Sequence, residues 1–157
     1  MTQPSVTEVA AAVDEIVRAH ATKEGPLLPI LHDVQARFGH IPETAMQPIA
    51  EALNIGRAEV HGVVSFYHDF HTEPRGRHIV RVCRSEACQA RGGLAVEEGA
   101  QRALGLGWNE TSADGRVTLE AVYCLGLCAS GPNATIDDRP AGRLDADRIA
   151  GLLSELG

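Results

Sequence analysis

The sequence predicts an α+β protein in two parts, a helical bundle over residues 1–75 and a smaller α/β layer domain over residues 76–157. Apolar residues recur at helical spacing through the first part, whereas short β-branched runs alternate with helical patterns in the second. The composition changes at the same place. Six of the seven histidines lie in the first part, and all four cysteines lie in the second.

Four short amphipathic helices are expected in the first part. Ser5 and Glu8 have the spacing of a capping box, which opens a first helix that runs to about His20. The other boundary signals are Gly39 after the second helix, Pro42 before the third and Gly56 before the fourth. We expect the fourth helix to extend to Phe70. Short helices joined by short loops favour an antiparallel bundle.

The second part is expected to alternate strands and helices. The predicted strands span residues 78–83, 117–123 and 133–136, and the predicted helices span 93–104 and a segment capped by Asp145. Asp114-Gly115 is a hairpin turn signal before the second strand. This order of elements is typical of a small α/β layer fold.

Charge and hydropathy exclude several classes of protein. The net charge of −7 argues against nucleic acid as the main partner. The apolar stretches are far shorter than the roughly 20 residues that a membrane span needs, so none is expected. The first residues lack a basic segment and carry Glu8, Asp14 and Glu15, so we expect no signal peptide and a cytoplasmic protein.

The four cysteines form two close pairs, which we call the first pair (Cys83 and Cys88) and the second pair (Cys124 and Cys128). Each pair directly follows a predicted strand, so the two loops are expected to face each other at one end of the sheet. Disulfides are disfavoured in a reducing cytosol. Thiolates are soft ligands that favour zinc or an iron–sulfur cluster.

The spacing of the cysteines alone favours an iron–sulfur cluster and leaves other sites open. A structural zinc prefers slightly closer ligand pairs, yet it remains an alternative in which the chain is a zinc-stabilised interaction module. Reversible disulfides would make it a thiol redox sensor, although the C-x-x-C motif is absent. A Rieske centre needs histidine ligands near its cysteines, and no histidine follows His78.

Two segments around the cysteines resemble a known family. C-R-S-E-A-C-Q-A-R-G-G at 83–93 and Y-C-L-G-L-C-A-S-G-P-N at 123–133 are similar to the cluster loops of the thioredoxin-like 2Fe–2S subunit of NADH dehydrogenases, including complex I. Residues 27–42 and 60–70 resemble the helical segment that precedes this ferredoxin domain. The resemblance implies a thioredoxin-like domain with one 2Fe–2S cluster on Cys83, Cys88, Cys124 and Cys128.

Within that family, S-F-Y-H-D-F at 65–70 and the segment at 83–93 are most similar to the gamma subunit of soluble NAD-dependent formate dehydrogenase. The resemblance implies two partners: a flavoprotein subunit with FMN and the NAD site, and a larger iron–sulfur and molybdenum catalytic subunit. The equivalent subunits of complex I and of NAD-reducing hydrogenases are the alternatives. We expect electron transfer and no catalytic acid, base or nucleophile in this chain, which also lacks a dinucleotide-binding motif.

Two further expectations concern side chains near these motifs. Residues 75–91 form a locally basic segment, with five arginines against the single acid Glu86. Arg84 and Arg91 belong to it, and we hypothesise that one of them raises the reduction potential of the cluster. The aromatic residues Phe66, Tyr67 and Tyr123 are expected to be packing residues, with Tyr123 also shielding the cluster from water.

Overall fold

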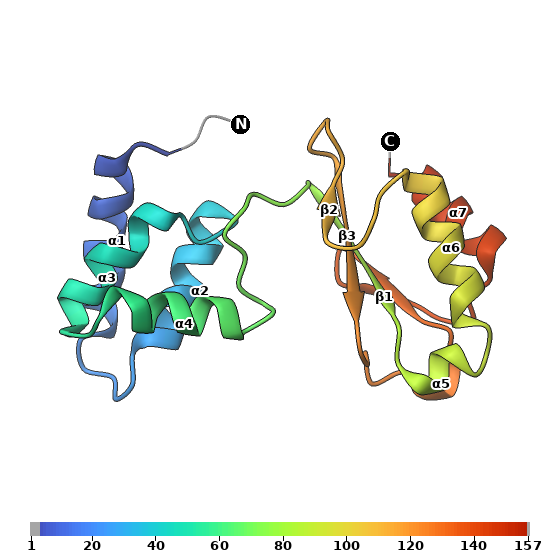
Figure 1. Ribbon diagram of the computed structural model, residues 1–157, viewed down its shortest axis with the longest axis horizontal. Helices are drawn as coiled ribbons and strands as arrows, with labels where there is room; N and C mark the ends of the chain where they lie inside the picture. The colour runs from blue at the N-terminus through green and yellow to red at the C-terminus, as the bar shows by residue number, and fades with distance from the viewer. Residues whose placement is uncertain (1–3, 157) are drawn as a thin grey trace. The chain divides into compact units, whose positions relative to one another are not determined.

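The computed structural model describes residues 4–156, and the chain divides between Pro74 and Arg75 into two compact units (Figure 1). We call them the helical unit and the sheet unit. The helical unit contains α1 (Val6–His20), α2 (Leu27–Phe38), α3 (Glu43–Leu53) and α4 (Arg57–Phe66). The sheet unit contains β1 (His78–Cys83), α5 (Glu86–Gln89), α6 (Gly93–Leu104), β2 (Glu110–Thr111), β3 (Val117–Val122), a 3-10 turn (Cys128–Ser130), β4 (Ala134–Ile136), β5 (Arg139–Ala141) and α7 (Ala146–Ser154).

The helix boundaries follow the local signals in the sequence. The Ser5 hydroxyl accepts a hydrogen bond from the Glu8 N–H at 3.3 Å, and the Glu8 carboxylate accepts one from the Ser5 N–H at 2.8 Å. The Ser5 hydroxyl also donates to the Glu8 carboxylate at 2.7 Å, and this bond, together with the one from the Ser5 N–H, lowers the pKa of Glu8. Gly39 ends α2 with a φ of 75°, a left-handed conformation that glycine adopts without a steric penalty. The predicted capping box and the predicted stop at Gly39 are both confirmed.

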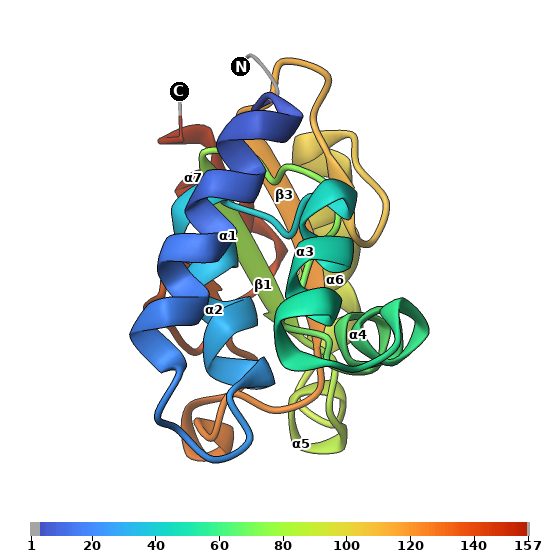
Figure 2. The same cartoon turned by 90° about the vertical axis from the view of Figure 1, so that its left-hand side faces the viewer.

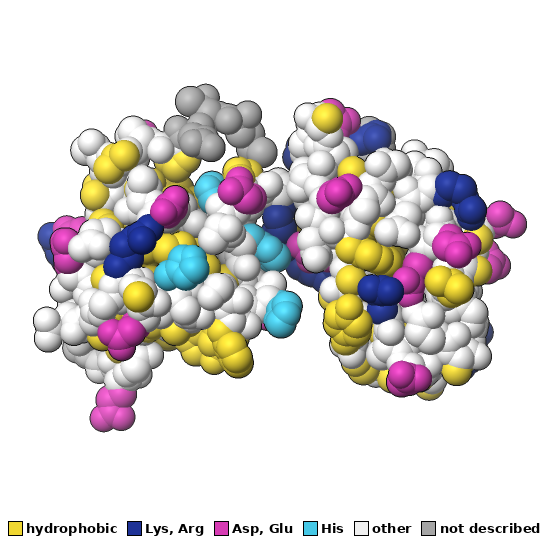
Figure 3. Space-filling view, in the orientation of Figure 1, with side chains coloured by type: hydrophobic (Ala, Val, Ile, Leu, Met, Phe, Trp, Pro, Cys, Tyr) yellow, Lys and Arg dark blue, Asp and Glu magenta, His cyan; other side chains and the backbone are white. Residues whose placement is uncertain are grey.

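The four helices enclose one apolar core. Its largest fully buried side chains are Val9, Val13, Ile30, Leu31, Val34, Ile41, Met46, Ile49 and Val60. Figure 2 shows α1 beside α2 and α3 around this core. Figure 3 shows histidine side chains on the surface of this unit.

None of the helices within residues 4–156 combines the length and the apolarity that a membrane crossing requires.

The predicted end of the fourth helix is wrong. The helix stops at Phe66, because Tyr67 has an extended backbone with φ −86° and ψ 117°. The chain then turns, and Phe70 returns to the core with its ring 4.9 Å from the ring of His32. Phe66 and Tyr67, which we expected to be packing residues, are 73% and 42% exposed.

The sheet unit contains a five-stranded mixed sheet in the order β2-β3-β1-β4-β5. β1 is parallel to β3, and the other neighbouring strands are antiparallel. Figures 1 and 2 show α6 and α7 side by side on one face of the sheet. The second core includes the buried Val80 and Leu119 of the sheet and the buried Val96 and Ile149 of the two helices. The predicted α+β class is confirmed.

Ion pairs join strands of the sheet. The Glu120 carboxylate is buried and accepts hydrogen bonds from Arg75 at 3.1 Å and from Arg81 at 3.0 Å. Arg81 also donates to Asp138 at 2.7 Å. Two arginines of the locally basic segment therefore have acidic partners within the sheet unit.

Candidate metal centre

The parallel pairing of β1 and β3 brings the two cysteine pairs to one edge of the sheet. Cys83 is the last residue of β1 and lies opposite Val122, the last residue of β3. The Arg84 N–H donates to the Val122 carbonyl at 2.7 Å, so the strands remain paired up to the point where the loops begin. Cys124 follows two residues after Val122. The two loops converge, as predicted, because β1 and β3 are paired in parallel and end side by side.

The first pair is buried. Cys83 is 2% exposed, and Cys88, on the short helix α5, is fully buried. The Cys83 sulfur lies 3.2 Å from the Ser85 hydroxyl. Burial acts to raise the pKa of Cys83, but hydrogen bonds with Ser85, Cys88 and the backbone of Leu125 outweigh it and lower that pKa. The surroundings of Cys83 therefore already favour its thiolate form.

The second pair is exposed and lies on an irregular loop. The Cys124 and Cys128 sulfurs are 3.8 Å apart, and the Gly126 N–H donates to the Cys124 sulfur at 3.3 Å. Cys124 has a φ of 149° and Gly126 a φ of 74°. A positive φ at a residue other than glycine costs of order 1–3 kcal/mol. The loop therefore brings the Cys124 and Cys128 sulfurs close to each other at the cost of backbone strain at Cys124.

The two pairs lie close enough to affect each other's protonation. The pKa of Cys88 is raised by burial, by the hydrogen bond with the Cys83 thiol, and by negative charge on Cys83 and Cys128. The pKa of Cys128 is raised mainly by the hydrogen bond with Cys124 and by the charge of Cys124. Burial and the charge of Cys83 raise it further. Thiolates crowded in this way repel one another, and a bound cation relieves the repulsion.

The spacing of the second pair fits two sulfurs bound to one metal. Two sulfurs bound at about 2.3 Å to a tetrahedral metal lie roughly 3.8 Å apart, which is the separation of the Cys124 and Cys128 sulfurs. Between residues 4 and 156, no three or more side chains of His, Cys, Asp or Glu gather as a site for a single ion. Four thiols arranged as two pairs suit a 2Fe–2S cluster, whose irons can each take two cysteines.

Two arginines near the cysteines differ in how their charge is paired. The Arg84 side chain donates to the Glu97 carboxylate at 2.9 Å, and its guanidinium lies 5.0 Å from the centre of the Trp108 ring. Glu97 is 4% exposed and also accepts from Gln89. Arg91 instead donates to the Ala129 carbonyl at 3.1 Å, on the second loop. The buried Glu97 therefore offsets the charge of Arg84.

Exposed apolar side chains lie next to the two cysteine loops in the sequence. Tyr123 and Leu127, next to Cys124 and Cys128 in the sequence, are 70% and 37% exposed. Leu94, in the first turn of α6, is 60% exposed. The prediction that Tyr123 is a packing residue is wrong. Contiguous exposed apolar patches mark protein interaction sites, whereas single exposed apolar residues are ordinary on protein surfaces.

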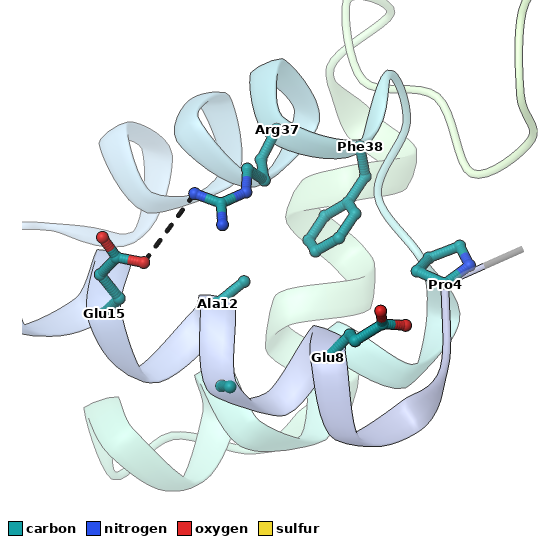
Figure 4. A pocket seen from close by; sticks show the side chains of 7 residues that line it. Pro4, Glu8, Ala12, Glu15, Arg37 and Phe38 are labelled. Carbon is teal, nitrogen blue, oxygen red and sulfur yellow. Dashed lines mark ion pairs between the residues drawn. The ribbon is translucent and has the colours of Figure 1, made fainter.

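A separate cavity of about 590 Å³ lies in the helical unit between α1 and α2 (Figure 4). Its wall includes Phe38 and the carboxylates of Glu8 and Glu15. Both carboxylates have structural partners, since Glu8 completes the capping box and Glu15 lies 3.8 Å from Arg37. This cavity contains no cysteine and contributes nothing to the cysteine site.

Comparison with known proteins gives the same family over most of the chain. Residues 13–157 match the family of thioredoxin-like 2Fe–2S ferredoxins. An NADH-quinone oxidoreductase subunit of Pseudomonas aeruginosa is 42% identical over 120 residues, which are 76% of this chain and 72% of that protein. The NADP-reducing hydrogenase subunit HndA of Solidesulfovibrio fructosivorans is 29% identical over 98% of this chain and 87% of its own length.

Among solved structures, the chain is similar to the crystal structure of an NAD+-reducing NiFe-hydrogenase in the H2-reduced state. The TM-score is 0.70 and the identity 27%, over 83% of this chain. The match spans only 22% of that hydrogenase chain. These relatives are subunits or chains of oxidoreductases that use nicotinamide cofactors or quinone, as their names state.

Proposed function

The chain belongs to the family of thioredoxin-like 2Fe–2S ferredoxins, and from this premise we propose that it is an electron-transfer subunit of an NAD-dependent oxidoreductase. We further propose that Cys83, Cys88, Cys124 and Cys128 hold its 2Fe–2S cluster. The observation that supports this assignment best is the arrangement of four thiols as two pairs at one sheet edge, with 3.8 Å between the sulfurs of the second pair. When bound, the cluster supplies reversible one-electron chemistry.

The residues of the chain supply binding, shielding and orientation. The buried first pair anchors one side of the site and keeps water from the Cys83 and Cys88 sulfurs. The exposed second pair brings the other side to the surface, where an electron can pass to a partner. No general acid or base is needed for this role, because the chain moves no proton of a substrate.

The partner in this proposal is a flavoprotein subunit with FMN and the NAD site. The exposed side chains of Tyr123, Leu127 and Leu94 support docking at the cysteine edge. For the helical unit, residues 1–75 in the sequence-based division, we propose a second docking role. Its exposed Phe66 and Tyr67, with ring centres 5.2 Å apart, present an aromatic pair to a partner.

For the parent complex we propose a soluble, molybdenum-containing, NAD-dependent formate dehydrogenase. The support is the similarity of the segments at 65–70 and 83–93 to its gamma subunit. The relatives compared above belong instead to NADH-quinone oxidoreductase and to hydrogenases, which are the competing parent complexes. Purification of the tagged chain with its native partners discriminates between them. Formate-dependent NAD+ reduction and bound molybdenum support the proposal, and hydrogen-dependent reduction or co-purified membrane subunits contradict it.

An EPR-monitored redox titration tests the electron-transfer role itself. The purified chain is reduced stepwise under argon, and the signal is integrated against a spin standard. We expect one unpaired electron per chain on full reduction, which disappears on reoxidation. A colourless, EPR-silent protein that holds one zinc ion would support the interaction module instead and would contradict electron transfer.

A further inference from the structure

The sulfurs of the second pair are close together but not bonded to each other. Cys124 and Cys128 are both exposed, and 3.8 Å separates their sulfurs. In a disulfide the two sulfurs are about 2.05 Å apart. The sulfurs of the second pair therefore need to approach each other by less than roughly 2 Å to form a disulfide. Because both residues are exposed, an oxidant in solution can reach them.

The two cysteines of this pair differ in how firmly their backbone is held. The Leu127 carbonyl accepts a hydrogen bond from the buried Asn133 Nδ2 at 2.6 Å, and on the other side of Cys128 a backbone carbonyl accepts one from Arg91 at 3.1 Å. Cys124 instead has a φ of 149°, a strained conformation for a residue other than glycine. A movement of Cys124 toward Cys128 can therefore relieve backbone strain while Cys128 stays in place.

The first pair is protected from the same oxidant. Cys83 and Cys88 are both buried, and Cys88 lies on the short helix α5. This helix is closely packed, since a Cβ atom at Gly93 would lie 2.8 Å from the Cys88 carbonyl oxygen. Oxidation in solution should therefore be confined to the second pair.

We propose that the second pair is a redox-sensitive lock in the cluster-free chain, in which a reversible disulfide between Cys124 and Cys128 prevents cluster loading until it is reduced. This inference rests on the proposed ligand role of these cysteines. The oxidant is a peroxide, which converts one thiol to a sulfenic acid and releases one water. The other thiol then displaces the hydroxyl group as a second water and forms the S–S bond. A dithiol reductant restores both thiols by exchange.

The lock has two consequences for the unloaded chain. The thiolate is the form of cysteine that binds a metal, so a disulfide leaves neither sulfur of the second pair free to act as a ligand. A disulfide is also reversible, whereas the sulfinic and sulfonic acids that form on further oxidation are essentially irreversible. The exposed pair can therefore be oxidised and recovered without permanent damage.

The test uses the full chain, freed of metal by a chelator and fully reduced before the reductant is removed. After treatment with hydrogen peroxide, we expect two of the four free thiols to be lost and the mass to fall by two hydrogen atoms. Peptide mass spectrometry should place the disulfide between Cys124 and Cys128. A disulfide that includes Cys83 or Cys88, or thiol loss without any disulfide, overturns the proposal.

Two variants control for the identity of the pair. Cys88→Ser keeps the second pair and should still form the disulfide. Cys124→Ser removes one partner and should form no disulfide within the chain under the same treatment. An intrachain disulfide in Cys124→Ser overturns the proposal, because the remaining cysteines would then pair across the site.

A second measurement tests the effect of the disulfide on cluster loading. A 2Fe–2S scaffold protein is mixed with the oxidised or the reduced chain without added thiol, and the iron content of the re-isolated chain is measured. We expect iron only in the reduced chain, and in the oxidised chain after dithiothreitol is added. Equal loading of both forms overturns the lock. Failure of the proposed function looks different, since the reduced chain would then take up no cluster although the disulfide still forms.

Discussion

The first and second cysteine pairs have opposite environments although they converge on one site. Cys83 and Cys88 are buried and belong to a regular strand and a short helix. Cys124 and Cys128 are exposed, and their loop contains two positive φ angles and no regular strand. The first pair is therefore part of the folded core, whereas the second pair is held mainly by loop contacts.

This difference separates two tasks of the site. A rigid, dry side fixes where the sulfurs are, and an exposed side lets electrons reach a partner. Asn133 links the two sides, since its amide contacts both Cys88 and Leu127. Changes at the first pair should therefore affect the fold as well as the cluster, and changes at the second pair should affect the cluster alone.

The largest effect is expected from replacing one cysteine of each pair. Cys88→Ser and Cys124→Ser should both lose bound iron, because each removes one of four ligands. In the cluster-free chain, Cys88→Ser should lower the free energy of unfolding by about 1–3 kcal/mol, since a hydroxyl is then buried in place of a thiol. The exposed Cys124→Ser should stay within about 0.5 kcal/mol. Urea unfolding measures both, and equal losses of stability would remove the distinction between the pairs.

The next effect concerns a close backbone contact beside the first pair. A Cβ atom at Gly93 would lie 2.8 Å from the Cys88 carbonyl oxygen, so Gly93→Ala must displace α5. We expect a loss of about 1–3 kcal/mol of stability and a lower iron content. Gly62→Ala in α4 is the matched control, because nothing lies within 4 Å of its Cβ. Alanine should stabilise that helix by roughly 0.5–1 kcal/mol. Thermal unfolding followed by circular dichroism compares the two variants.

A smaller effect is expected in thiol reactivity. In the cluster-free chain, iodoacetamide should modify the exposed Cys124 and Cys128 before the buried Cys83 and Cys88, as read by peptide mass spectrometry. Because the pKa of Cys128 is raised, its thiolate fraction should keep increasing above the pH at which an ordinary thiol is already ionised. Its modification rate should therefore continue to rise with pH. Faster modification of Cys88 than of Cys128 at neutral pH would contradict the assigned burial.

The smallest effect distinguishes two arginines. Arg91→Gln removes a positive charge that is bonded to a backbone carbonyl, whereas the charge of Arg84 is already offset by Glu97. We expect Arg91→Gln to lower the midpoint potential by less than about 59 mV, the shift that corresponds to a tenfold change in the equilibrium constant for reduction. Arg84→Gln should lower the midpoint potential by a smaller amount than Arg91→Gln. A potentiometric titration of the three proteins orders the effects. A larger shift for Arg84→Gln would show that Glu97 does not compensate its charge.

Much of the fold could be predicted because long elements carry periodic patterns. The helix at 93–104 and the strand at 78–83 have the boundaries that the sequence indicates. The short elements α5, β2 and β5, of two to four residues, were not predicted, since such segments contain too few residues to show a period. The end of α4 at Phe66 was also missed, because the following aromatic residues continue the helical spacing.

The candidate site shows the same division. The cysteine spacing and the predicted strands indicated that the two loops converge, but the burial of one pair and the exposure of the other depend on tertiary packing. The exposure of Tyr123 contradicts the expectation of a packing residue. The predicted strand at 117–123 includes this tyrosine, whereas β3 ends at Val122. Asn133 was predicted only as the start of a strand. Its role depends on contacts with Leu127 and Cys88, which no local pattern encodes.

The most direct test of the central claim is the metal and sulfide content of the unmodified chain. The protein is purified anaerobically from iron-replete cells and analysed for iron, zinc and acid-labile sulfide. If the four cysteines bind one 2Fe–2S cluster, each chain holds two iron atoms and two sulfides, with little zinc. One zinc ion per chain, or a chain without iron and sulfide, would contradict the claim.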